Sequence, residues 1–343
     1  MSNLQDEMKR VKQRVDRMIL DELLPKSSPI KEVDLLYKMM RDYPGRTAKG
    51  MRPFLCVTTC KAAGGTEEDA LLTAACIELF QNWILIHDDI EDGSELRRGL
   101  PALHRTYGEP LALNAGDALH ARTWEALLKN RPRLGLARTF AVMEEFSRMV
   151  NETTGGQHME LGWVVSRKWN LTEKDYFEMC TRKTSWYTVA SPCRLGAIVA
   201  DAKRQVLDQL MEFGVDLGVA FQIQDDSLNL VGDQKKYGKA KSDDILEGKR
   251  TLILLHLLSV AGQSERDKVI AIMNKDRAKN TADDVSYVLS AIDKYDAIGF
   301  ARKQAAELLK DALATLRSVE WKGDKESAAL LGSFARYAVE REW

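Results

Sequence analysis

An acidic motif in this 343-residue chain has the spacing of a metal site. Residues 87–92 read His-Asp-Asp-Ile-Glu-Asp and close a long apolar segment with helical periodicity. Asp88 and Asp92 are four residues apart, so on a helix they share one face. Carboxylate oxygens are the ligands that hard divalent cations prefer. Read alone, the motif is equally typical of a solvated helix end with local salt bridges.

A second motif repeats the arrangement about 130 residues later, and the repetition favours a metal site over a solvated helix end. Residues 221–226 read Phe-Gln-Ile-Gln-Asp-Asp, and Asp225 and Asn229 again share a helix face. Mg²⁺ held by only a few carboxylates keeps positions open for phosphate oxygens. Two such clusters facing one cavity predict chemistry on a diphosphate. The predicted metal ligands are Asp88, Asp89, Asp92, Asp225 and Asp226.

Basic residues near both motifs could bind the phosphates, because guanidinium groups form forked contacts with phosphate and helix starts favour anions. They lie in three elements: Lys49 and Arg52 just before a helix that starts near Pro53, Arg97 and Arg98 after the first motif, and Lys239 and Lys249, each beside a glycine, after the second. Taken separately, each element is also typical of a surface turn or a structural contact.

Composition excludes several classes of protein. The 50 basic and 51 acidic side chains nearly cancel, so bulk attraction to nucleic acid or membranes is not expected. Five cysteines, an odd number, favour reduced intracellular thiols. The charged N-terminus lacks a signal-peptide pattern, and no uninterrupted apolar run reaches the ~18–20 residues of a membrane span. We therefore expect a soluble, cytoplasmic protein without a membrane span.

Nearly every periodic segment predicts helix, including residues 66–91 and 205–230, and alternating β-branched runs are scarce. Breaks between the helices are short, and no linker or repeat is visible. The sequence therefore predicts one all-α domain over residues 1–343, a single large bundle of long helices around a central cavity.

Together, the motifs resemble those of the trans-isoprenyl diphosphate synthases, in particular the short-chain, geranylgeranyl diphosphate synthase-like members. The resemblance runs from about Lys49 to Trp343. It rests on motifs in the family's order: Lys49-x-x-Arg52-Pro53, Asp88-Asp89-x-x-Asp92, Arg97-Arg98-Gly99, Gly156-Gln157, Lys183-Thr184, Phe221-Gln222-x-x-Asp225-Asp226, Gly238-Lys239 and Glu247-Gly248-Lys249-x-Thr251.

This resemblance implies the isoprenoid synthase type I fold, a homodimer and three Mg²⁺ ions per active site. It implies that an allylic diphosphate ionises, that its cation alkylates isopentenyl diphosphate head-to-tail, and that the released diphosphate accepts the proton. The implied metal ligands are Asp88, Asp92 and Asp225. The allylic diphosphate would be bound by Arg97, Lys183, Lys239, Lys249 and Asn229, and the isopentenyl diphosphate by Lys49, Arg52, Gln81 and Arg98. Lys183, Thr184 and Gln222 would stabilise the cation. Asn229 departs from the family, where a third aspartate is common.

Product length depends on where the growing tail meets a wall. Along a helix axis, Ile84 lies about 6 Å, Trp83 about 7.5 Å and Phe80 about 12 Å from Asp88. In the family, bulky residues at these positions shorten the product, so Trp83 and Phe80 favour a twenty-carbon product, geranylgeranyl diphosphate. The alternative for both rings is ordinary packing against a neighbouring helix.

Four other functions fit parts of the pattern. A farnesyl or geranylfarnesyl diphosphate synthase would differ only in product length. A class I terpene cyclase would need no isopentenyl site. The presence of all four predicted isopentenyl diphosphate ligands, Lys49, Arg52, Gln81 and Arg98, argues against a cyclase. A non-catalytic partner subunit would usually lose the aspartates, and a helical scaffold would leave the phosphate-binding set unexplained.

Overall fold

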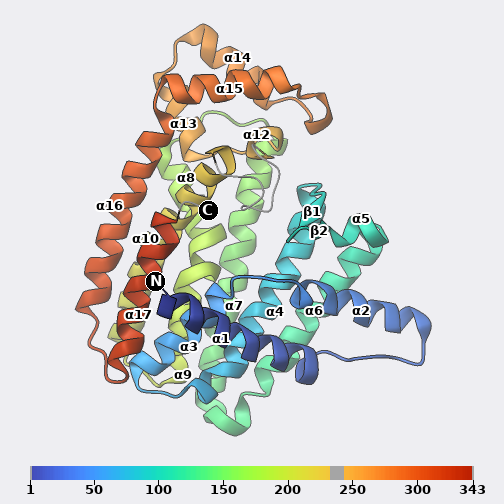
Figure 1. Ribbon diagram of the computed structural model, residues 1–343, viewed down its shortest axis with the longest axis vertical. Coiled ribbons are helices and arrows are strands. Elements are labelled where there is room, and N and C mark those ends of the chain that lie inside the picture. The colour runs from blue at the N-terminus through green and yellow to red at the C-terminus, as the bar shows by residue number, and fades with distance from the viewer. Residues whose placement is uncertain (1, 232–242, 342–343) are drawn as a thin grey trace. The chain divides into compact units, whose positions relative to one another are not determined.

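A computed structural model describes residues 2–231 and 243–341 of the chain (Figure 1). The elements before residue 130 are α1 (Ser2–Met18), the π-helix η1 (Ile19–Leu23), α2 (Lys31–Gly45), α3 (Met51–Ala63), α4 (Glu67–Glu91), β1 (Leu96–Arg97), β2 (Leu100–Pro101), α5 (Leu103–Tyr107) and α6 (Glu109–Leu128). The later elements are α7 (Arg131–Val165), α8 (Glu173–Cys180), the π-helix η2 (Thr181–Ala190), α9 (Ser191–Val199), α10 (Arg204–Val231), α12 (Asp243–Leu246), α13 (Leu252–Val260), α14 (Gln263–Met273), the 3₁₀-helix η3 (Arg277–Lys279), α15 (Ala282–Lys294), α16 (Ala297–Ser318) and α17 (Lys325–Glu340). The all-α prediction is confirmed, apart from two strands of two residues each.

The chain forms two compact units, each assembled from segments distant in sequence. Unit 1 comprises Met1–Arg148, Tyr187–Met211 and Ser318–Phe334, and unit 2 comprises Met149–Trp186, Glu212–Arg317 and Ala335–Trp343. Since segments of the two units alternate along the chain, the single domain over residues 1–343 stays a prediction.

The helix α4 forms the core of unit 1. A capping box between Thr66 and Asp69 satisfies its first free N–H groups, and it packs against α3, α6 and α9. Among the described residues, α4 alone is long and apolar enough to cross a membrane, but 83% of its apolar window is buried inside the protein. Packing in the core therefore accounts for its apolar sequence.

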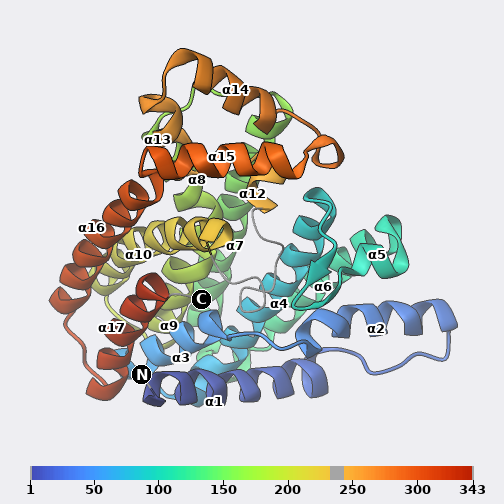
Figure 2. The same ribbon diagram turned by 45° about the horizontal axis from the view of Figure 1, so that its top comes forward.

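Close backbone approaches fix the other helices of unit 1. A Cβ atom added to Gly196 of α9 would lie 2.1 Å from the carbonyl oxygen of Cys56 in α3, so only glycine permits this contact. The N-terminal helix α1 lies against α3 and α4 (Figure 2). All five cysteines are buried and free of disulfides, as their odd number predicted.

The short hairpin of β1 and β2 follows the first acidic motif. Its turn residues Arg98 and Gly99 have φ values of 54° and 78°, the left-handed conformation that a two-residue hairpin turn requires. For arginine this conformation costs about 1–2 kcal/mol. Other contacts of Arg98, described below, hold it in place.

Unit 2 contains α10 from Glu212 onward. The helices α14 and α15 lie side by side, and α15 also contacts α13 and α12 (Figure 1). A Cβ atom on Gly218 of α10 would lie 2.4 Å from the Cα atom of Ser185, so α10 and η2 touch along their backbones. The predicted helices over 66–91 and 205–230 are confirmed as α4 and α10.

Candidate active site

The first aspartate motif forms the last turn of α4 in unit 1. The backbone N–H of Asp92 donates to the carbonyl of Asp88 at 2.8 Å, so the helical register continues through the motif and both carboxylates keep one face. The two neighbouring aspartates differ in exposure. The side chain of Asp88 is 20% exposed, and that of Asp89 is 1% exposed.

Asp89 is held by two residues from outside α4. The hydroxyl of Tyr43, in α2, donates to one of its carboxylate oxygens. Arg97 donates to the other oxygen through Nε at 2.9 Å, and its Nη2 forms an ion pair with the same oxygen. The Tyr43 hydroxyl in turn accepts the backbone N–H of Leu103 at 3.1 Å. Arg97 Nη2 also lies 3.5 Å from Asp88 Oδ2, so the residue predicted to bind phosphate is next to the residues predicted to bind metal.

Three guanidinium groups gather in unit 1. Arg98 donates to the carbonyl of Tyr43 at 2.7 Å and to Asn82 Oδ1 at 3.2 Å. Burial lowers the pKa of Arg98; the nearby Glu78 opposes this, while the positive charges of Arg97 and Arg52 lower the pKa further. Such a concentration of positive charge suits a diphosphate.

Two buried polar atoms at the predicted isopentenyl diphosphate residues are unsatisfied. The Nε of Arg52 and the Oε1 of Gln81 have no hydrogen-bond partner among the described residues. The Nη2 of Arg52 donates to Thr188 Oγ1 at 2.9 Å, and the guanidinium lies 4.2 Å from the ring centroid of Tyr187. Lys49 precedes α3, next to Gly50 with a left-handed φ of 64°. Because a buried donor without a partner is rare, the Nε of Arg52 suits an acceptor such as a phosphate oxygen, whereas the Oε1 of Gln81 needs a donor.

The second aspartate motif lies near the end of α10 in unit 2. As in the first motif, one aspartate is part-exposed and its neighbour is buried. The side chain of Asp225 is 34% exposed and accepts from Arg341 at 2.8 Å. Asp226 is buried. One of its oxygens accepts from the Tyr176 hydroxyl and the other from Gln222 Nε2, both at 2.7 Å. Burial raises the pKa of Asp226, and the nearby Asp244 adds to the rise.

The remaining predicted residues of unit 2 surround this motif. Thr184 Oγ1 donates to Gln222 Oε1 at 2.6 Å, so Thr184, Gln222 and Asp226 form one chain of hydrogen bonds. Lys183 forms an ion pair with Glu160 of α7. The Asn229 oxygen accepts the backbone N–H of Asp244 at 3.2 Å.

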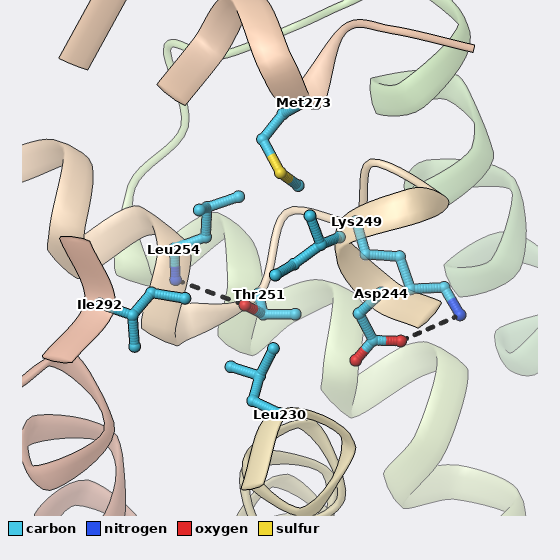
Figure 3. Close-up of a pocket in the computed structure, with 8 residues that line it drawn as sticks. Leu230, Asp244, Lys249, Thr251, Leu254, Met273 and Ile292 are labelled. Carbon is cyan, nitrogen blue, oxygen red and sulfur yellow. Dashed lines mark hydrogen bonds and ion pairs between the residues drawn. The ribbon is translucent and has the colours of Figure 1, made fainter. Parts of the chain in front are cut away.

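Lys249 borders a small pocket of unit 2 (Figure 3). Its Nζ lies 2.8 Å from Glu247 Oε2 and 3.8 Å from Asp244 Oδ1. The pocket is lined mainly by apolar side chains, with Asp244 and Thr251 as its other polar residues, and has a volume of about 10 Å³, room for roughly one water molecule. A prenyl chain does not fit there. Lys239, the other predicted lysine of this region, lies outside the described residues.

Two of the predicted chain-length residues, Phe80 and Trp83, belong to an aromatic cluster. Phe80 is fully buried and meets Trp83 edge-on with ring centroids 5.2 Å apart. Trp83 stacks on His120 of α6 at 4.1 Å, and Trp124 Nε1 donates to His120 Nε2 at 2.7 Å. Ile84 is half-buried.

Sequence reasoning missed several residues that hold the predicted ones. These are Tyr43, Tyr176, His120, Trp124, Tyr187 and Thr188. The spacing of His120 and Trp124, four apart, was a signal that they share a helix face. Nothing in the sequence indicated that this face meets Trp83.

The oxygen donors suit Mg²⁺. Within residues 2–231 and 243–341, no group of three or more His, Cys, Asp or Glu side chains is arranged to hold a metal by itself. Mg²⁺ usually takes only one or two carboxylates and completes its shell with water and substrate phosphates. The part-exposed Asp88, Asp92 and Asp225 match that requirement.

Known proteins share both the fold and the sequence. A family model described as polyprenyl synthetase matches residues 33–292. A short chain isoprenyl diphosphate synthase of Methanothermobacter thermautotrophicus is 33% identical, over 86% of this chain and 86% of that protein. A geranylgeranyl diphosphate synthase of Saccharolobus solfataricus is 32% identical, over 85% of this chain and 86% of that one.

A solved structure of a protein with the same kind of name is also similar to this chain. It is a geranylgeranyl pyrophosphate synthase from Corynebacterium glutamicum complexed with isoprenyl diphosphate and magnesium. It superposes with a TM-score of 0.89 and 27% identity, covering 98% of this chain and 99% of that one. The fold is therefore the all-α isoprenoid synthase fold, and the chain belongs to the polyprenyl synthetase family.

Proposed function

We propose that this protein is a Mg²⁺-dependent, head-to-tail prenyltransferase that condenses isopentenyl diphosphate with allylic diphosphates and makes geranylgeranyl diphosphate. The observation that carries the proposal is the buried, unsatisfied Nε–H of Arg52 beside the guanidinium of Arg98. A buried guanidinium N–H is costly unless an acceptor, such as an oxygen of an anion, completes it. Family membership gives the anion its identity as a prenyl diphosphate.

The metal and diphosphate sites follow from the exposed oxygens. Asp88, Asp92 and Asp225 would hold Mg²⁺, three ions in all, which would supply positive charge to the departing diphosphate. The allylic diphosphate would also be bound by Arg97, Lys183, Lys239, Lys249 and Asn229. Isopentenyl diphosphate would be bound by Lys49, Arg52, Gln81 and Arg98. Asp89 and Asp226, also predicted as metal ligands, are buried with their oxygens occupied by other side chains.

The chain's own residues address the two difficult species of the reaction. The allylic C–O bond breaks, its electron pair leaves with the diphosphate, and Arg97 and Lys183 bind that developing charge. The double bond of isopentenyl diphosphate attacks the allylic cation, which forms the new C–C bond and leaves the positive charge on the isopentenyl unit. The diphosphate takes a proton from the carbon next to that charge, and the C–H electron pair forms the new double bond. Thr184 and Gln222 present oxygen dipoles, already fixed by their mutual hydrogen bond, to the cation.

Three further assignments concern assembly, location and product length. We infer a homodimer, because Leu111, Leu113 and Leu128 of α6 and Leu136 and Phe140 of α7 are large, exposed apolar side chains. We infer the cytoplasm from the five reduced cysteines. A twenty-carbon product is favoured by the buried rings of Phe80 and Trp83.

Product analysis tests the proposal. The purified protein would be incubated with Mg²⁺, isopentenyl diphosphate and dimethylallyl, geranyl or farnesyl diphosphate in turn, and the dephosphorylated alcohols separated by chromatography. Geranylgeraniol from all three primers is the expected result. Farnesol or geranylfarnesol as the end product would keep the reaction and correct the chain length. A cyclic hydrocarbon formed without isopentenyl diphosphate would instead identify a class I terpene cyclase.

A further inference from the structure

The two aspartate pairs share an arrangement that their sequences do not reveal. In each unit, the first aspartate is part-exposed and the second is buried. In each unit, a tyrosine hydroxyl from a different helix donates to the buried carboxylate. These tyrosines are Tyr43 of α2 and Tyr176 of α8, and both rings are themselves almost fully buried.

The second oxygen of each buried carboxylate is also occupied. Arg97 takes it at Asp89, and Gln222 takes it at Asp226. Both donors are residues to which we assign contact with the reacting diphosphate or cation. Each buried aspartate therefore connects a tyrosine on one side to a substrate-binding side chain on the other.

Building on the function proposed above, we propose that Tyr43 and Tyr176 are positioning residues. Each anchors the second carboxylate of one aspartate pair, so that the first carboxylate is aimed at the metal-bound diphosphate. Asp89 and Asp226 are then anchors rather than direct metal ligands.

An anchored carboxylate can orient its neighbour because the two aspartates of each pair are adjacent along the backbone. Asp88 and Asp89 are adjacent in the last turn of α4, as are Asp225 and Asp226 in α10, so fixing one carboxylate sets the rotation of the turn that carries its neighbour. Mg²⁺ tolerates little departure from octahedral geometry. Tyr43 adds a further constraint, because its hydroxyl also accepts the N–H of Leu103 directly after the hairpin.

The test measures metal binding rather than turnover. Mn²⁺ replaces Mg²⁺, and free Mn²⁺ is followed by electron paramagnetic resonance while the full-length protein is titrated in the presence of inorganic diphosphate. Tyr43→Phe and Tyr176→Phe keep the ring and lose the hydroxyl. We expect each to weaken Mn²⁺ binding roughly tenfold or more, as partners of metal ligands do. The melting temperature of each variant shows whether it is folded.

Tyr295→Phe is the matched control. The Tyr295 hydroxyl also bonds to a carboxylate, Glu265 at 2.8 Å, but belongs to neither aspartate pair. Its loss should leave Mn²⁺ binding unchanged. Unchanged binding in folded Tyr43→Phe and Tyr176→Phe overturns the inference, whereas failure of the unmodified protein to bind Mn²⁺ with diphosphate overturns the proposed function itself.

A second pair of variants covers the case in which a tyrosine variant does not fold. Asp226→Asn retains an oxygen that accepts the Tyr176 hydroxyl, whereas Asp225→Asn removes a ligand charge. We expect the larger loss of Mn²⁺ affinity in Asp225→Asn. An equal or larger loss in Asp226→Asn means that the buried aspartate is itself a ligand.

Discussion

At the scale of single residues, the positions proposed to bind substrate are held by other side chains. Arg52 shows this most directly. Its guanidinium stacks over the Tyr187 ring and donates to the Thr188 hydroxyl, while its Nε is left without a partner within the described part of the chain. The long side chain is thus ordered before a ligand arrives, which reduces the entropy lost on binding.

Removing the Thr188 hydroxyl tests this arrangement. Thr188→Val should raise the KM for isopentenyl diphosphate by about tenfold, because a hydrogen bond to a charged group contributes about 1.5 kcal/mol or more. The KM for the allylic substrate should stay constant. Steady-state kinetics with each substrate varied in turn separates the two. Thr188→Ser, which keeps the hydroxyl, should restore the original value.

Thr73→Val controls for the loss of any buried threonine hydroxyl in unit 1, since Thr73 bonds to Asn130 instead of a substrate residue. An equal change in both KM values for Thr188→Val would show that Thr188 supports the fold in general and not Arg52 in particular.

The ring of Trp83 carries a second prediction at this scale. Trp83 is fixed by stacking on His120, which Trp124 holds through its indole N–H. Trp83→Ala or Phe80→Ala should lengthen the main product by at least one five-carbon unit, since truncation removes the surface that stops the tail. Chromatography of the product alcohols measures this. Unchanged profiles in both variants would mean that these rings only pack the core.

At the scale of elements, the contact between α7 and η2 sets the position of Lys183. A Cβ atom on Gly156 would lie 2.2 Å from the Lys183 backbone nitrogen, too close for any side chain. One turn further along α7, Glu160 forms the ion pair with Lys183. The glycine therefore allows the close approach that places this lysine against its acidic partner.

Two neighbouring glycines give a matched test. Gly156→Ala should push η2 away and lower kcat at least tenfold, with a clear loss of melting temperature. Gly155→Ala, where nothing lies within 4 Å, should be neutral or stabilise by up to about 1 kcal/mol through higher helix propensity. Assays and melting curves of both variants check this. Normal activity in Gly156→Ala would show that the close approach of α7 and η2 does not set the position of Lys183.

The helices α10 and α16 supply a prediction on pH. Burial raises the pKa of Asp216 to about 6, and the charges of Asp311 and Glu212 add to the rise. The folded protein therefore holds this proton more tightly than the unfolded chain, and the stability gained at low pH is lost as the pH rises through about 6. Asp216→Asn should stabilise by about 1 kcal/mol at pH 7.5, after allowance for solvent screening.

That gain should shrink steadily as the pH falls from about 6 towards 4, where the original aspartic acid is also neutral. Melting temperatures of both proteins across this range measure it. A difference between them that does not vary with pH would contradict the assignment to ionisation of Asp216.

Periodicity predicted the long helices, because apolar spacing reports helix directly. The spacing of Asp88 and Asp92 likewise placed them on one face. It did not separate Asp88 from Asp89, because α4 is buried on nearly every side and its sequence has no polar face to orient it. The partner Tyr43 lies 46 residues earlier, and such long-range pairs leave no local pattern. The strands on either side of the Arg98–Gly99 turn were missed because strands of two residues are too short for alternation to appear.

At the scale of the whole molecule, the exposed apolar side chains need an explanation. Of the eleven large apolar side chains that are exposed among the described residues, five lie on α6 and the first part of α7. Leu136 and Phe140 are four residues apart and share one face of α7. Concentrated apolar exposure of this kind is typical of surfaces that a second protein covers.

If a second copy of the protein covers these apolar side chains, negative charges introduced among them should separate the subunits. Leu136→Asp combined with Phe140→Asp should convert a dimer into a monomer, because two buried carboxylates without partners cost more than the apolar contacts they replace. Light scattering coupled to size exclusion measures the mass, and circular dichroism confirms the fold. Val165→Asp is the control, since Val165 is 82% exposed but lies at the other end of α7. A double variant that stays dimeric would place the subunit interface on other helices, and a monomeric unmodified protein would leave these side chains to a different partner.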